Sequence, residues 1–170
     1  MNENNNIGAI SGDEYSLCQK MFKILHCNAL WIMKSDGYSL TVLVSDNMVW
    51  KHYWDKKCYL VDPNIKDINL VEGSKPNRRI DLGTDQAGFK ENGFLYDLYK
   101  LFNVEEFISI EKQKGKSKYC FRFFTNHNRF LFANQVLNTI PIIGCFMNSM
   151  IERCRLALDQ QPSLNLLELH

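Results

Sequence analysis

The chain has 170 residues, of which 45% are hydrophobic and 23% charged, and its formal net charge is +1. This size and composition predict one globular domain with a core of its own. A charge balance this close to neutral excludes a broad basic surface for nucleic acid.

Cysteine usage and the N-terminus predict the compartment. None of the six cysteines forms a Cys-x-x-Cys pair, and no Cys/His grouping has zinc spacing, so we expect no metal site and no cofactor. The opening Met-Asn-Glu-Asn-Asn-Asn lacks the regions of a signal peptide, and no apolar run reaches the ~18 residues that span a bilayer. We therefore expect a cytoplasmic protein with reduced thiols and no membrane contact.

The hydrophobic period switches several times between the helical and the extended value. The predicted elements, in chain order, are a helix over 12–27, strands over 28–34 and 38–44 joined by the turn Ser35-Asp-Gly37, a helix from a Ser45 or Asp46 cap to about 57, a helical turn over 64–68, a strand over 78–82, a helix over 94–102, strands over 106–111 and 119–125, and a helical segment over 128–159. Pro141 either kinks this last segment or begins a second helix.

The order of these elements predicts an antiparallel sheet with helices packed on it, which is an α+β domain. The last helical segment carries an apolar stripe that we expect to be buried: Phe132, Val136, Ile143, Phe146, Met150 and Ala157. We assign residues 11–159 to the domain, residues 1–10 to a disordered tail and residues 160–170 to a linker or tail.

An aromatic-rich segment precedes an Asp-Pro pair and is the best candidate for a site. Trp50, Tyr53 and Tyr59 lie close in sequence to Asp62, and together they could line a pocket for a small ligand. They could equally be the apolar side of a helix docked on a sheet, which such aromatic stripes more often are. Asp62 could also cap the turn that follows it.

No motif for catalysis is present. The glycine-rich stretch over 83–90 lacks a lysine directly after its last glycine, where Phe89 intervenes, so it is not a phosphate-binding loop. There is neither a Gly-x-Ser-x-Gly elbow nor a His-Glu-x-x-His pair. We therefore expect a protein that is not an enzyme.

Several segments resemble the N-terminal sensor domain of bacterial LuxR-type transcription regulators. They are Trp50-Lys-His-Tyr53 through Tyr59-Leu-Val-Asp62-Pro63, Phe94-Leu-Tyr-Asp-Leu-Tyr-Lys-Leu-Phe102, the strand pair over 106–125 and the final Ile151-Glu-Arg-Cys-Arg-Leu-Ala-Leu. The resemblance covers about residues 15–158. It implies a PAS-like α-β-α sandwich with a five-stranded antiparallel sheet and a pocket between sheet and helices.

In family members that bind acyl-homoserine lactones, the helix tyrosine and the acid before proline line this pocket. The resemblance places Tyr53 and Asp62 there, with Trp50 and Tyr59 beside them, and a carboxylate suits a ligand amide N–H. The chain departs from the family at Val49, where a tryptophan is expected, and over 76–80, which lacks a second one. It is more similar to the divergent sensor branch of these regulators.

The resemblance implies a regulatory domain in quorum sensing that binds a small signal molecule or a partner and forms a homodimer through a helix. DNA binding would need a helix-turn-helix domain that is absent from this chain. The alternative is a stand-alone protein-interaction module with the same fold and no small-molecule ligand.

Overall fold

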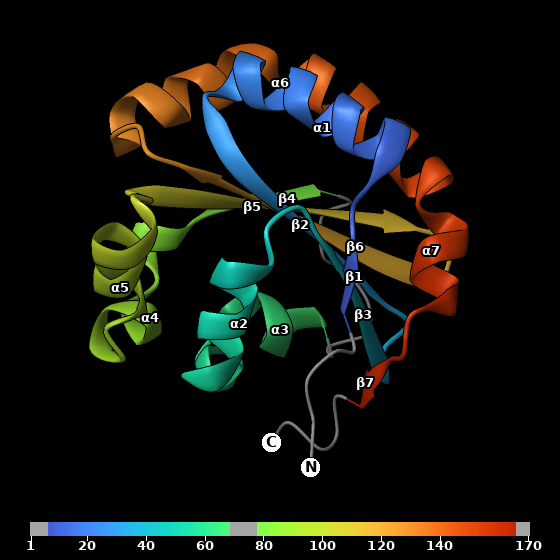
Figure 1. The fold of residues 1–170 in the computed structure, drawn as a ribbon, viewed down its shortest axis with the longest axis horizontal. Coiled ribbons are helices and arrows are strands. Elements are labelled where there is room, and N and C mark those ends of the chain that lie inside the picture. The colour runs from blue at the N-terminus through green and yellow to red at the C-terminus, as the bar shows by residue number, and fades with distance from the viewer. Residues whose placement is uncertain (1–6, 69–77, 166–170) are drawn as a thin grey trace.

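The computed structural model describes residues 7–68 and 78–165, and it places helices on both faces of one sheet (Figure 1). The helices are α1 (Gly12–Leu25), α2 (Asn47–Asp55), α3 (Pro63–Ile68), α4 (Ala87–Glu91), α5 (Phe94–Phe102), α6 (Arg129–Arg153) and α7 (Arg155–Gln160). The strands are β1 (Ile7–Ala9), β2 (Cys27–Ser35), β3 (Ser39–Val44), β4 (Arg78–Leu82), β5 (Glu106–Lys114), β6 (Ser117–Thr125) and β7 (Leu164–Asn165). Single 3-10 turns lie at Cys58–Leu60 and Gly83–Asp85.

The sheet has seven strands in the order β1-β3-β2-β6-β5-β4, with β7 also paired to β3. The α+β class is confirmed, but the predicted count of five strands is wrong. The two additional strands are short and share the outer edge of β3, where β1 pairs in parallel and β7 antiparallel. An unpaired edge attracts any extended backbone that passes it, so these strands need no alternating sequence pattern of their own.

Each face of the sheet has its own hydrophobic core. Helices α1 and α6 cover one face, and α2, α3, α4 and α5 lie on the other (Figure 1). Alternation along β6 sends Phe121 and Phe123 to the first face, and Cys120 and Phe124 to the second. Arg122 lies between them in this alternation and faces the second core, among aromatic rings.

Local contacts explain where the second helix begins. The Asp46 carboxylate accepts a hydrogen bond from the Met48 N–H at 2.8 Å and is the N-cap of α2. Ser45, the other predicted cap, instead accepts from the Leu30 N–H at 2.8 Å and ties the chain to β2. Lys57 has a φ of 53°, in the left-handed region, and follows directly on the end of this helix.

The long helix α6 runs through Pro141 without interruption, and the break falls at Cys154, before α7. By length and a mean hydropathy of 1.5 it is, within the described part of the chain, the one helix that could cross a membrane. Core helices of soluble proteins share these properties, and α6 lies against α1 over the sheet. Five of the six side chains of the predicted stripe are buried: Phe132, Val136, Ile143, Phe146 and Met150. The sixth, Ala157, lies in α7 and is exposed, so this end of the predicted stripe is wrong.

Two adjacent isoleucines of α6 allow a test of this packing. Ile143 is 0% exposed and Ile142 is 48% exposed. We expect Ile143→Ala to lower the free energy of unfolding by about 2–5 kcal/mol, because it leaves a cavity in the core. Ile142→Ala should change it by less than about 1 kcal/mol. Urea denaturation measures both, and equal losses would contradict the orientation of α6.

Candidate functional site

The structure brings together two of the predicted site residues. The Tyr53 hydroxyl, from α2, donates a hydrogen bond to Asp62 Oδ2 at 2.7 Å, and both side chains are 0% exposed. Asp62 Oδ1 accepts from the Asn64 N–H at 2.9 Å. The carboxylate therefore caps the start of α3 with one oxygen and holds Tyr53 with the other, so the capping contact exists beside the tyrosine contact.

A residue that sequence reasoning missed completes the cluster. Arg122 of β6 is 0% exposed, and its guanidinium forms a bidentate ion pair with Asp62, with Nη1–Oδ2 at 2.8 Å and Nη2–Oδ1 at 3.0 Å. Its Nε donates to Ser109 Oγ at 2.9 Å, and Nη2 also donates to Asn64 Oδ1 at 2.7 Å. This geometry is the planar fork on which arginine recognition of carboxylates depends.

Aromatic rings surround the guanidinium where hydrogen bonds do not. Its Cζ lies 4.7 Å from the ring centroid of Phe107, 5.6 Å from Trp31 and 5.8 Å from Phe89. A desolvated cation gains energy from the negative faces of such rings. The arginine is therefore accommodated in an apolar core by one carboxylate, two neutral oxygens and π-faces.

The buried guanidinium of Arg122 stays charged. Burial disfavours the charged guanidinium, but the adjacent Asp62 carboxylate outweighs this effect and raises the pKa of Arg122 above its ordinary value. Burial, and then the charge of Asp62, raise the pKa of Tyr53 well above 10. Tyr53 therefore remains a hydrogen-bond donor at neutral pH.

Polar contacts continue from the cluster toward the end of the β5–β6 hairpin. Asn64 Nδ2 donates to Asp81 Oδ2 at 3.1 Å and to Glu111 Oε1 at 3.3 Å. Glu111 in turn pairs with Lys118 at 3.2 Å. The side chains of Asp62 and Asn64 thus join α3 to three strands of the sheet.

The two other predicted site residues lie in the aromatic layer around α2. Trp50 is 5% exposed, and its ring centroid lies 5.3 Å from Tyr53 and 5.0 Å from Trp31. Tyr59 is half-buried and packs against Trp54, with a centroid distance of 4.6 Å. Tyr53, Asp62 and Trp50 are therefore parts of one packed cluster, and Tyr59 is a partly buried side chain that packs against the same core.

The cluster is closed. The side chains of Tyr53, Asp62 and Arg122 are 0% exposed, so bulk solvent does not reach any of them. One polar atom in this layer is unmatched: among the described residues, the buried indole N–H of Trp31 has no hydrogen-bond partner. Buried donors without a partner are rare and need a specific explanation.

A signal for Arg122 was present in the sequence. The run Cys120-Phe-Arg-Phe-Phe124 places one cation inside a strand that is otherwise apolar on both faces. A strand of this kind is a central one, and a charge on a central strand requires a buried partner. The partner lies 60 residues earlier in the sequence, so only the fold identifies it.

A second ionic cluster lies between α2 and α5. Asp97 Oδ2 accepts from His52 Nε2 at 2.9 Å and pairs with Lys56 Nζ at 2.5 Å. Burial alone would raise the pKa of Asp97, but the hydrogen bonds from Lys56 and His52 outweigh it, so the pKa is lowered. Burial raises the pKa of the nearby Cys58 thiol to about 11, which leaves it protonated.

The arrangement of the described His, Cys, Asp and Glu side chains also bears on metal binding. Within the described residues, no group of three or more His, Cys, Asp or Glu side chains could hold a metal ion.

Comparison with known proteins shows a likeness of fold. No family model and no curated protein matches the sequence. Among solved structures, the chain is similar to the ligand-binding domain of VqsR from Pseudomonas aeruginosa, a LuxR-type regulator, with a TM-score of 0.50 and 10% identity over 82% of this chain and 85% of that one. At this identity the likeness is one of architecture alone.

Removing one hydroxyl tests the closed cluster. Tyr53→Phe loses the hydrogen bond to the buried Asp62 carboxylate, and we expect a loss of about 1–3 kcal/mol at pH 7. Because the pKa of Tyr53 is raised on folding, its contribution is present below pH 10 and decreases as the pH rises further. The difference in the free energy of unfolding between this variant and the wild type should therefore be smaller above pH 10 than at pH 7. Urea titrations at both pH values measure it. Tyr38→Phe, at a side chain that is 75% exposed, is the control and should show no difference.

Proposed function

We propose that this chain is a regulatory domain of a LuxR-type transcription regulator whose internal site is filled by its own Arg122. The observation that carries the proposal is the fully buried guanidinium on Asp62, in the layer where the family resemblance places a signal molecule. Regulation in such a domain proceeds through contact with a second copy or another protein. This combines the two functions expected from the sequence.

The contacts of Arg122 support its role as a substitute for a ligand. Asp62 is the residue that the resemblance assigns to a ligand N–H, and here it receives two N–H groups from the arginine instead. The aromatic faces of Trp31, Phe89 and Phe107 enclose the guanidinium. A small molecule could reach Asp62 only by displacing a charge-assisted bidentate pair, which costs several kcal/mol when the partner stays buried.

The outward face of α6 supports association. No Asp, Glu, Lys, Arg or His occurs from Phe130 to Ile151, so this face carries no charge to oppose a partner. Several apolar side chains on it are about half exposed or more: Phe130, Leu131, Leu137 and Ile142. Exposed apolar surface of this extent on one helix is typical of protein interfaces, and we propose a homodimer through it.

The domain is proposed to bind and not to catalyse. The buried Cys58 thiol is protonated and accepts a hydrogen bond from Asn92, and His52 is engaged by Asp97. A protonated thiol is not prepared as a nucleophile.

A second candidate function is sensing of a small molecule in the same layer. The unpartnered indole N–H of Trp31 favours it, because a ligand acceptor would satisfy this donor once Arg122 had moved away. Mass spectrometry of the purified protein under native conditions separates the two candidates. The first predicts the mass of the polypeptide alone. A stoichiometric small molecule that Tyr53→Phe releases would establish the second and overturn the first.

Chemical rescue tests the role of Arg122. We expect Arg122→Ala to cost about 3–5 kcal/mol, because it leaves a cavity and an uncompensated buried carboxylate. Methylguanidinium at low millimolar concentration should raise the melting temperature of this variant and leave that of the wild type unchanged. Methylammonium at the same ionic strength is the control, since it carries the charge without the planar fork. Equal effects of the two cations would contradict a guanidinium-shaped site.

The proposed dimer has its own test. Leu137 of α6 is 62% exposed, and Leu137→Glu places a charge in the uncharged face. We expect the variant to sediment as a monomer of about 20 kDa at micromolar concentrations at which the wild type is a dimer. Tyr96→Glu on α5, at a side chain that is 65% exposed on the other side of the sheet, is the control and should remain dimeric. A monomeric wild type would refute the proposal.

A further inference from the structure

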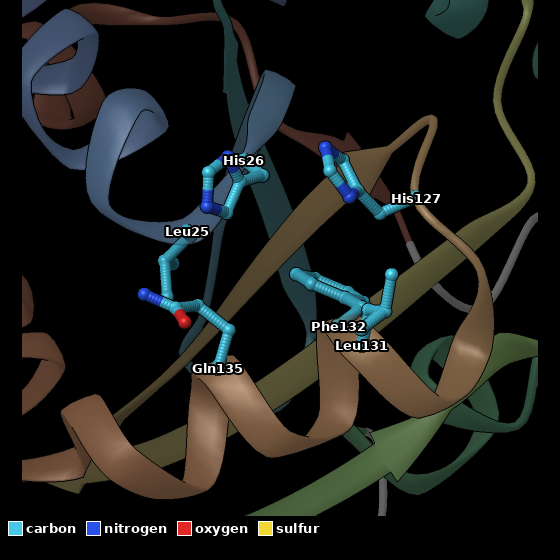
Figure 2. Close-up of a pocket in the computed structure, with 6 residues that line it drawn as sticks. All are labelled: Leu25, His26, His127, Leu131, Phe132 and Gln135. Carbon is cyan, nitrogen blue, oxygen red and sulfur yellow. The ribbon is translucent and has the colours of Figure 1, made fainter.

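We propose that a pocket between the end of α1 and the start of α6 binds a small planar aromatic carboxylate. The pocket lies on the face of the sheet opposite to Arg122 and shares no residue with that cluster. It has a volume of about 170 Å³. Its lining residues are Leu25, His26, His127, Leu131, Phe132 and Gln135 (Figure 2).

The size of the pocket limits the ligand to a single ring. A cavity of about 150 Å³ holds one benzene molecule, whereas drug-sized ligands need roughly 300 Å³ or more. A volume of about 170 Å³ therefore fits a six-membered ring with one small substituent. It excludes a lactone with an acyl chain.

The floor of the pocket is apolar and firmly held. Leu25 is 0% exposed and Phe132 is 1% exposed, and both belong to the core on this face of the sheet. Leu131, which is 58% exposed, stands at the side of the pocket one residue before Phe132 (Figure 2). Aromatic rings bind such a surface through offset stacking and burial of their faces.

Two imidazoles provide the polar wall. The rings of His26 and His127 pack against each other at one side of the pocket, with centroids 4.6 Å apart and planes inclined by 40° (Figure 2). Each ring presents an N–H, and a carboxylate is an acceptor that two such donors can share. The start of α6 lies beside them, and its partial positive charge favours the same anion.

A single buried hydroxyl fixes both histidines. Thr125 Oγ1 donates to the His26 carbonyl at 2.6 Å and accepts from the His127 N–H at 3.0 Å, and Thr125 is 0% exposed. His26 takes the left-handed conformation, with a φ of 55°, as it ends α1. The main chain of both histidines is thus held at one point at the end of β6, which favours the preorganisation that a binding site requires.

Gln135 adds an acceptor at the inner side of the pocket. Its amide Nε2 donates to the Ile24 carbonyl at 2.6 Å, which fixes the side chain across the gap between α6 and α1. The amide oxygen is then directed away from Ile24 and can accept from a ring hydroxyl. A hydroxylated benzoate is therefore accommodated as well as benzoate itself.

Benzoate and its fluorinated analogue are suitable probes. The line width of 4-fluorobenzoate in ¹⁹F NMR should increase with added protein, and benzoate should reverse the effect with a dissociation constant in the millimolar range, as expected for about nine non-hydrogen atoms. Benzyl alcohol, which has the ring without the charge, should compete at least about tenfold less well. Equal competition by the two would overturn the assignment of a carboxylate.

Variants locate the binding. His127→Gln and His26→Asn, the latter compatible with a left-handed backbone, should each weaken binding by about tenfold. Leu131→Ala should weaken it severalfold, and Leu101→Ala, a similarly exposed leucine of α5 on the other side of the sheet, should not. If a histidine variant fails to fold, the leucine pair still decides. Binding that survives all three pocket variants would overturn the proposal. So would an absence of probe binding to the wild type, whatever its oligomeric state.

Discussion

The ion pair between Arg122 and Asp62 determines how the α2–α5 side of the molecule can pack. A guanidinium at 0% exposure has no water to solvate it, so the helices on this face must supply a carboxylate and close over it. Asp62 can do so only if α2 ends at Asp55 and α3 begins at Pro63, directly after Asp62. Tyr53 then reaches the same carboxylate from α2. The position of two helices on this face, α2 and α3, follows from one charge on a central strand.

The opposite face of the sheet has no such constraint. The core between the sheet, α1 and α6 consists mainly of apolar side chains, and it depends on shape more than on directed bonds. Apolar packing of this kind tolerates exchange of side chains of similar volume, whereas a buried ion pair tolerates almost none. The two faces therefore differ in the kind of change they can absorb, and a site that adapts to new ligands is easier to build on the α1–α6 side.

Sequence reasoning identified the features that depend on local chemistry. The turn at Ser35-Asp-Gly37, the cap at Asp46 and the stripe of α6 all follow from neighbours in the chain, and the structure has each of them. The proximity of Tyr53 and Asp62 came from the family resemblance, and it is present. The two residues lie in one core cluster with Trp50, while their role toward a ligand stays a prediction.

The features that were missed depend on long-range pairing. In the sequence Arg122 resembles an ordinary strand residue, because its partner Asp62 is far away along the chain. Strands β1 and β7 are too short to show a hydrophobic period. Helix α4 lies in a segment with several glycines, for which the sequence predicts a loop. In the structure Phe89 of this helix is buried between Phe94 and Phe107. In each case tertiary contacts supply the stability that the local sequence lacks.

The shared edge of β3 has a mechanical consequence. β1 covers Val42–Val44 and β7 covers Ser39 and Leu40, so the chain enters and leaves the domain along one strand. Gly8 lies so close to Leu43 and Gln161 that a methyl group there would come within 2.6 Å of atoms of both side chains, so the two end segments also contact each other. Tension on the C-terminal segment would detach β7 first, because two residues hold it. The uncovered part of β3 would then offer free backbone groups, on which an extended segment of another protein could add a strand.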